Sequence, residues 1–305
     1  MTGQWRKNKV CVQVLFLIAA YCWVPVVRAE TPRVVVSIAP LHSLVASVMV
    51  GVGVPDLLIS AGQSPHHAAL KPSIMRKVSQ ADLLVMVDPH CLERSLGQVA
   101  QRKPPEQQLN IHQVAGIRRL MYPAEHTHGG CDYDPHLWLD PNNAIQIVRA
   151  VSAALVQLDP SHRALYEQNQ AATIARLTQL HARVLQQLSQ PLPPYIVYHN
   201  AYAYFERRYG LSALFTVLKN PEIQPGIKRI RDVRRQIRAA NVTCLFTEPQ
   251  FPSKLVRPIT AGNPLTVIVL DPLGYRLTPG ADLYFELLDN MAVGFSHCLQ
   301  TALHD

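Results

Sequence analysis

Four side chains that can bind a metal ion stand where a predicted strand ends or a predicted helix begins. His66 lies in the turn after a short apolar run, and His199 and Asp271 each close a strand-like run. His136 lies in a loop before a helix that begins near Pro141. In open α/β sheets the ligand site is the crevice outside the carboxyl ends of the strands. The sequence therefore allows these four residues to converge in one crevice between two lobes.

The residues alone leave a structural role open for each of these side chains. The four are separated by 70, 63 and 72 positions, so only the tertiary fold can bring them together. A single histidine at a strand end is more often hydrogen-bonded within the fold, and Asp271 can instead cap the turn that follows it. The sequence has no H-x-x-x-H or C-x-x-C spacing, which excludes a zincin or zinc-finger site.

A second set of candidate metal ligands stands in the irregular segment between Pro123 and Pro135. His126 and His128 lie there two residues apart, with acidic residues nearby. A flexible segment of this composition can bind a metal ion loosely. The alternative is a polar loop in contact with solvent.

The donor types at the four main positions indicate which metal would fit. Three neutral imidazoles and one carboxylate suit Zn²⁺, which binds histidine nitrogen at about 2.0–2.1 Å. Mn²⁺ favours more oxygen ligands, and the general order of affinity puts zinc above manganese at a nitrogen-rich site. Zinc is therefore the expected ligand, with Cu²⁺ as its chemical competitor.

Residues 1–29 have the pattern of an export signal. Basic residues precede an apolar run at 10–27, and Ala29 offers a small-residue cleavage site. The run is 18 residues long, so an uncleaved membrane anchor is the alternative. Tyr21 rather than a small residue precedes Cys22, which argues against a lipoprotein. We therefore expect export to the periplasm, with no stable membrane insertion after signal cleavage.

Removal of the signal changes the charge from which partners are judged. The full chain has 29 Lys and Arg against 21 Asp and Glu, a net charge of +8. The signal takes four of the basic residues, which leaves 25 against 21, or +4. This charge is too mild to indicate a nucleic-acid partner. The 48% hydrophobic content excludes a disordered chain, and six cysteines in 305 residues are too few for a disulfide scaffold.

Short apolar runs alternate with helical patterns through the rest of the chain, which predicts parallel sheets covered by helices. The runs expected to form strands are residues 34–39, 57–60, 83–88, 109–112, 195–199, 214–218, 242–248 and 266–271. The expected shorter helices are residues 41–50, 72–80, 143–158, 201–209, 225–239 and 282–298.

Residues 161–190 contain no Gly or Pro and carry apolar residues at helical spacing. They predict one helix of about 28 residues, roughly 42 Å long. We therefore predict an α/β fold of two lobes with mainly parallel sheets, joined by one long rigid helix, with the metal site at the lobe interface. The predicted divisions are a signal peptide at 1–29, an N-terminal lobe at 30–158, a linking helix at 159–190 and a C-terminal lobe at 191–305.

At the same residues the chain resembles the periplasmic zinc-binding proteins of ABC-type zinc importers, the ZnuA type of metal-binding solute-binding protein. The matching segments follow the family's order and span nearly the whole mature chain. They are SIAPLHSLVASVM (37–49), SPHHAALKPS (64–73), DPHLWLDP (134–141), YHNAYAYFERRYGL (198–211), NPEIQPG (220–226), TCLFTEPQF (243–251) and LDPLG (270–274).

The resemblance implies a site, a function and a partner. The family's histidine ligands fall on His66, His136 and His199, and Asp271 matches a position where relatives supply a carboxylate or leave the place to water. His67 stands where relatives usually carry Asp, so it is an additional candidate ligand. The protein would then bind Zn²⁺ as a transported ligand, deliver it to the inner-membrane permease of an ABC importer, and act as a monomer and not as an enzyme.

The resemblance also bears on the cysteines and on the histidine segment. The family often pairs cysteines at the places of Cys244 and Cys298, which implies a disulfide there. Zinc members often carry a long insertion rich in His and acidic residues before the second ligand. Here that insertion is reduced to residues 125–134, so His126 and His128 would be auxiliary at most.

Two other functions remain open at this point. A protein of the same fold can bind manganese or iron. A secreted zinc hydrolase would use three histidines and an open fourth position to activate water. Against the hydrolase, no Glu or His stands beside a ligand in a recognised base motif, and Asp271 would close the site.

Overall fold

The computed structural model describes residues 31–60, 63, 65–67, 71–122, 131–218 and 223–302. The predicted export signal lies outside the described residues. Within them, no helix is both long and apolar enough to cross a membrane.

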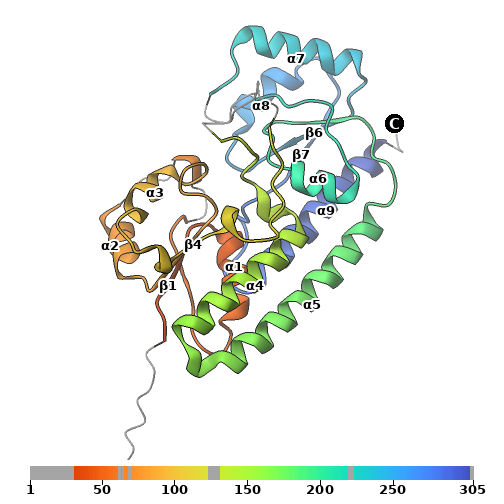
Figure 1. Cartoon of the computed structure of the whole chain (residues 1–305). Coiled ribbons are helices and arrows are strands. Elements are labelled where there is room, and N and C mark those ends of the chain that lie inside the picture. Colours follow the sequence, from red (N-terminus) through yellow and green to blue (C-terminus); the bar gives the residue numbers. More distant parts are fainter. Residues whose placement is uncertain are drawn as a thin grey trace, which may run out of the picture. The chain divides into compact units, whose positions relative to one another are not determined.

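The first sheet has four parallel strands in the order β2-β1-β3-β4. Its elements are β1 (Val34–Val36), α1 (Ala39–Val48), β2 (Asp56–Leu57), α2 (Pro72–Gln80), β3 (Leu83–Met86), α3 (Arg94–Ala100) and β4 (Gln108–Asn110). Figure 1 labels its strands β1 and β4, with α2 and α3 nearby. The strands β1 and β3 are buried along their whole length. This burial explains why they read as continuous apolar runs. Right-handed crossovers in this strand order put α1 on one face of the sheet and α2 and α3 on the other.

The second sheet has three parallel strands in the order β5-β6-β7. Its elements are β5 (Tyr195–Val197), α6 (Ala203–Tyr209), α7 (Ile227–Ala239), β6 (Cys244–Thr247), α8 (Ser253–Thr260), β7 (Thr266–Val269) and α9 (Leu283–Ala302). Alternate side chains enter two cores: Tyr195 belongs to the main cluster, whereas Ile196 joins Val233 of α7 and Ile259 of α8 in a second cluster. This period of two is what a sheet covered on both faces requires.

Two long helices connect the sheets. They are α4 (Pro141–Leu158) and α5 (Arg163–Gln187). The helix α5 has 25 residues and packs against α4, α1 and α9. Leu177, Leu180 and Val184 form its buried stripe, at the 3/4 spacing of an amphipathic helix. The predicted long linking helix is confirmed.

The described elements differ from the expected ones in three places. The helices α3 and α8 were not expected. Residues 214–218 form only an isolated parallel bridge, Val197 to Thr216, and no regular strand. They still lie along β5, because the N–H groups of Leu214 and Val217 donate to the carbonyl oxygens of Tyr195 and Val197. Arg229 donates to the carbonyl oxygens of Thr216 and Val217, so these groups are hydrogen-bonded to a side chain instead of to another strand. Short 3₁₀ helices complete the fold: η1 (Pro65–His67), η2 (Pro105–Gln107), η3 (Ile111–Gln113), η4 (Leu137–Leu139) and η5 (Pro160–His162).

The two sheets share one hydrophobic core. Its main cluster includes Val36 and Leu84 of the first sheet together with Phe246 of the second and Phe295 of α9. The buried indole of Trp138 donates from Nε1 to the carbonyl oxygen of Pro272 at 2.9 Å, which ties η4 to the loop after β7. This shared core fixes the carboxyl ends of both sheets relative to each other.

Candidate metal centre

Three of the predicted ligands come together at the carboxyl ends of the two sheets. His66 lies in η1, His136 immediately precedes η4, and His199 follows β5 by two residues. One donor atom of each lies within 4.8 Å of those of the other two. The ring centroids of His136 and His199 are 5.2 Å apart, and that of His66 is 6.2 Å from both. Three donors thus surround one point, as the crevice argument predicts.

Two buried carboxylates orient two of these imidazoles. Nδ1 of His136 lies 2.7 Å from Oδ1 of Asp134, and Nδ1 of His199 lies 2.8 Å from Oε1 of Glu248. Because a carboxylate only accepts hydrogen bonds, each Nδ1 carries the proton and donates it. Each Nε2 is therefore the nitrogen with a lone pair for a metal ion, which is the arrangement that metal-binding histidines generally show.

The fold holds both carboxylates in place. Asp134 also accepts a hydrogen bond from the backbone N–H of His136 at 2.9 Å, and its carbonyl oxygen accepts one from Tyr204 at 2.9 Å. Glu248 directly follows β6, and Nε2 of Gln250 donates to its second oxygen. Neither carboxylate can turn away from its imidazole without losing a second partner.

The charge around the site favours a cation. Asp134, Glu248 and His199 are all at most 4% exposed. Burial, and after it the nearby carboxylates of Glu248 and Asp271, raise the pKa of Tyr202 well above its usual value. Tyr202 therefore stays neutral and adds no charge of its own, whereas the carboxylates of Asp134 and Glu248 place negative charge beside the imidazoles that a cation would balance. A divalent ion bound by neutral histidines meets this requirement.

Aromatic side chains line the imidazoles. The ring of Trp138 has its centroid 5.3 Å from that of His136, and the ring of Phe251 lies 6.2 Å from His199. A nitrogen-rich, largely buried site of this kind suits Zn²⁺ better than Mn²⁺.

Asp271 stands outside the group of three histidines. Its Oδ1 accepts a hydrogen bond from the backbone N–H of Leu273 at 3.3 Å, and its Oδ2 accepts one from the backbone N–H of Arg276 at 3.2 Å. These bonds are those of a residue that caps a turn. Each of these oxygens still has a lone pair that could bind a metal ion, so ligation by Asp271 stays a prediction. His126 and His128 lie outside the described residues, as does the side chain of His67.

The residues that sequence reasoning missed are Asp134 and Glu248. Asp134 stands two residues before His136 in the segment DPH, and this close spacing is a usable signal. Glu248 lies 49 positions from His199. Only the pairing of β5 with β6 brings its strand end beside that histidine.

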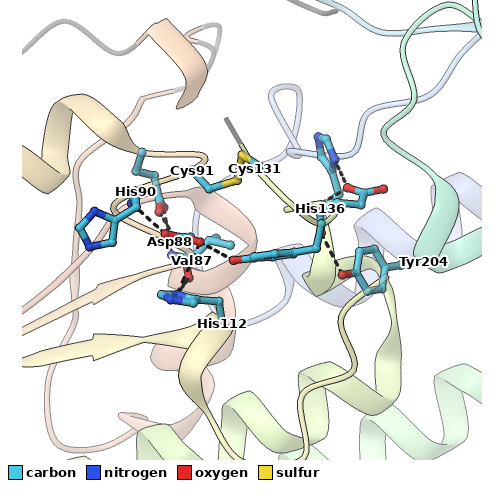
Figure 2. Close-up of a disulfide and its surroundings, with 11 residues drawn as sticks. Val87, Asp88, His90, Cys91, His112, Cys131, His136 and Tyr204 are labelled. Atoms are coloured by element: carbon cyan, nitrogen blue, oxygen red, sulfur yellow. Dashed lines mark hydrogen bonds and ion pairs between the residues drawn. A yellow bond between two sulfur atoms is a disulfide. The ribbon is translucent and has the colours of Figure 1, made fainter. Parts of the chain in front are cut away.

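The residues that the structure describes form two disulfides. Cys244 and Cys298 are joined, with Cα atoms 6.0 Å apart, which confirms the implied pairing. Cys91 and Cys131 form the second, which was not expected (Figure 2).

Known proteins that are similar to this chain include zinc-uptake proteins. A family model described as the periplasmic zinc-uptake complex component A matches residues 34–298. The high-affinity zinc uptake system protein ZnuA of Brucella abortus is 34% identical over 88% of this chain and 92% of its own. The ZnuA protein of Yersinia pestis is 30% identical over 98% of this chain and 99% of its own.

Solved structures share the fold. A crystal structure of ZnuA superposes with a TM-score of 0.74 at 26% identity, covering 88% of this chain and 99% of that one. The binding protein FpvC of Pseudomonas aeruginosa, in complex with Mn²⁺, gives 0.78 at 22% identity over 90% of this chain and all of its own. With a family model that spans nearly the whole described chain and relatives at 30–34% identity, this chain belongs to the family of periplasmic zinc-uptake component A, the ZnuA family.

Proposed function

We propose that this protein captures Zn²⁺ in the periplasm and delivers it to the inner-membrane permease of an ABC-type zinc importer. The observation that carries the proposal is the convergence of three histidine donors within 4.8 Å of one another. The names of the relatives from Brucella and Yersinia as zinc uptake proteins support it. Zn²⁺ is cargo here, so the site must bind it and later release it.

The ligands we propose are His66, His136 and His199, with Asp271 or a water molecule in fourth place. Asp134 and Glu248 keep the proton on Nδ1 of their histidines, so Nε2 is ready to bind without a change of tautomer. Each imidazole must be neutral to coordinate, and the ordinary pKa of histidine is about 6.5, so acid competes with the metal.

The three histidines also help to decide between zinc binding and the alternative functions, which are manganese or iron binding and catalysis. FpvC was crystallised with Mn²⁺, but its 22% identity carries the fold and not the ligand. The nitrogen-rich donors favour zinc over manganese and iron. We propose a monomeric binding protein without catalysis, because delivery requires the ion to leave. We also propose that export removes residues 1–29, so that the mature protein begins at Glu30.

Zinc titration of the metal-free protein, with a competing chelator as the indicator, tests the proposal. We expect one tightly bound Zn²⁺ per chain and weaker binding of Mn²⁺. Removal of a group that orients a ligand costs about 10–100-fold in affinity, so His136→Ala and His199→Ala should each cost about a hundredfold or more. The exposed His297 of α9 supplies the control: His297→Ala should bind as the wild type does. If both site variants keep wild-type affinity, the proposed site is wrong.

A further inference from the structure

The disulfide Cys91–Cys131 joins the end of the first sheet to the segment that leads into the metal centre. Cys91 lies in the turn between β3 and α3, and Cys131 begins the segment 131–134. The two Cα atoms are 5.3 Å apart, and both residues are only 6% exposed. In Figure 2 this disulfide lies between Asp88 and His136.

A second contact fixes the same two segments to each other. The hydroxyl of Tyr133 donates a hydrogen bond to Oδ2 of Asp88, three positions before Cys91. The ring of Tyr133 stacks on that of His112, with centroids 6.4 Å apart and planes at 21°. The disulfide and this hydrogen bond therefore anchor residues 131 and 133 to the turn after β3. Figure 2 shows the disulfide beside Asp88.

The anchored segment continues directly into the residue that orients a ligand. The backbone N–H of Asp134 donates to the carbonyl oxygen of Leu120 at 2.9 Å. The Oδ1 atom of Asp134 accepts hydrogen bonds from both the backbone N–H and Nδ1 of His136. The direction in which Nε2 of His136 points thus depends on where Asp134 sits, three residues after Cys131.

We propose that Cys91–Cys131 is a positioning disulfide of the metal centre: by fixing segment 131–134 to the β3 end, it holds Asp134 and so aims His136 at the ion. The inference rests on the proposed function. It states in addition that zinc affinity depends on this disulfide, although neither cysteine is one of the proposed ligands. A disulfide that only stabilised the fold would raise the unfolding temperature and leave affinity at lower temperature unchanged.

The second disulfide provides a matched control. Cys244–Cys298 closes a loop of 54 residues and Cys91–Cys131 one of 40, so the loop-entropy model gives both a similar effect on the unfolded state. Cys244 is in β6 and Cys298 in α9, and both are fully buried in the core behind the sheet. Double alanine variants, Cys91→Ala/Cys131→Ala and Cys244→Ala/Cys298→Ala, leave no free thiol from the broken pair to bind zinc or mispair.

Zinc affinity is measured by chelator competition well below the unfolding temperature of each variant. Loss of Cys91–Cys131 should weaken binding about tenfold, the lower end of the range for groups that orient metal ligands, because Tyr133 and Tyr204 still hold the segment. Loss of Cys244–Cys298 should change affinity less than about twofold. Visible spectra of the Co²⁺-loaded proteins add a readout of ligand geometry: the bands should change only in the first variant.

A second variant keeps the test decisive if the first fails to fold. Tyr133→Phe leaves the disulfide intact and removes the hydrogen bond to Asp88, and it should weaken zinc binding about threefold. Unchanged affinity in Cys91→Ala/Cys131→Ala, or in Tyr133→Phe if only that variant folds, overturns the inference, provided that His136→Ala has lost binding. If His136→Ala itself binds normally, the proposed function has failed, which is a different result.

Discussion

The carboxylates that contact His136 and His199 decide which imidazole nitrogen is available to a metal ion. Oε1 of Glu248 accepts a hydrogen bond from Nδ1 of His199 at 2.8 Å, and Glu248 is 2% exposed. Its charge also makes Nε2 of the imidazole a stronger electron-pair donor to a metal ion, because the negative carboxylate stabilises the positive charge that metal binding places on the ring. The pair His136–Asp134 has the same design.

Replacing Glu248 by Gln tests this design. The amide oxygen can still accept the hydrogen bond from His199, whereas the charge is lost. We expect zinc affinity to fall about tenfold or more, measured by chelator competition at constant pH. The exposed Glu286 of α9 gives a control of the same chemistry, because Glu286→Gln should leave affinity unchanged. Equal affinities for the two variants would show that Glu248 contributes shape and not charge.

Glu93 predicts a specific dependence of stability on pH. Burial raises its pKa from 4.5 to about 7, although its carboxylate accepts hydrogen bonds from the N–H groups of Val87 and Asp88. Between these two pKa values the folded protein holds a proton that the unfolded chain has lost. The free energy of unfolding therefore falls as pH rises through this window.

The variant Glu93→Gln removes the titrating proton and keeps one carbonyl acceptor. Relative to the variant, the wild type should lose about 2–3 kcal/mol of stability between pH 5 and pH 8. Urea unfolding of both proteins, with chelator present to exclude metal linkage, measures the difference. A difference that stays constant across this range would contradict the raised pKa.

At the scale of single residues, the sequence predicted the three histidines but not the carboxylates that orient two of them. His66, His136 and His199 were candidates because strand ends and helix starts are visible as pattern, and the family resemblance then implied that they are the ligands. Asp134 and Glu248 act through hydrogen bonds whose geometry depends on backbone conformation and on the pairing of β5 with β6. The disulfide Cys91–Cys131 joins residues 40 positions apart, and no local pattern specifies such a pair.

Among the elements, α4 connects the metal centre to both sheets. Asp140 is its N-cap and accepts a hydrogen bond from the backbone N–H of Asn142. The same carboxylate accepts two hydrogen bonds from Arg208 of α6, at 2.8 and 2.7 Å. Asp140 is 3% exposed. One side chain thus begins the helix and pairs with a helix that packs on the other sheet.

Loss of this contact should be costly. Asp140→Ala removes an N-cap, worth about 1 kcal/mol, and leaves a partly buried guanidinium without its partner. We expect the free energy of unfolding to fall by about 2–4 kcal/mol, measured by denaturant titration. The exposed ion pair Arg163–Glu167 on α5 is the comparison: Arg163→Ala should cost about 0.5 kcal/mol or less. Similar losses of unfolding free energy in both variants would show that Asp140 does not stabilise the fold by capping α4 and pairing with Arg208.

The elements that sequence reasoning missed share a physical cause. The helix α8 contains Pro258, which breaks the expected helical pattern. The helix α3 spans seven residues and includes Gly97, where a Cβ atom would lie 2.1 Å from the carbonyl oxygen of Pro89. Close packing against the preceding turn requires glycine there, although glycine lowers helix propensity. Tertiary contacts and not local preference form these two helices.

At the scale of the molecule, the shared core determines how zinc affects stability. Core residues from both sheets, among them Val36 and Phe246, belong to one cluster. We therefore expect residues 31 onward to unfold in a single transition, although they form two separate sheets. The proposed ligands come from both parts: His66 and His136 lie in the connections around the first sheet, and His199 follows a strand of the second.

The proposed set of ligands is complete only when these parts are assembled, so zinc should shift the whole unfolding transition and not a fraction of it. At a free Zn²⁺ concentration 100 times the dissociation constant, the stabilisation is about 2.7 kcal/mol. For a chain of this size that corresponds to a rise in Tm of about 5 °C, which differential scanning calorimetry with and without chelator can measure. His199→Ala should lose this rise while His297→Ala keeps it. A trace in which zinc moves one component and leaves another in place would mean that the two sheets unfold independently and that the ion stabilises only one of them.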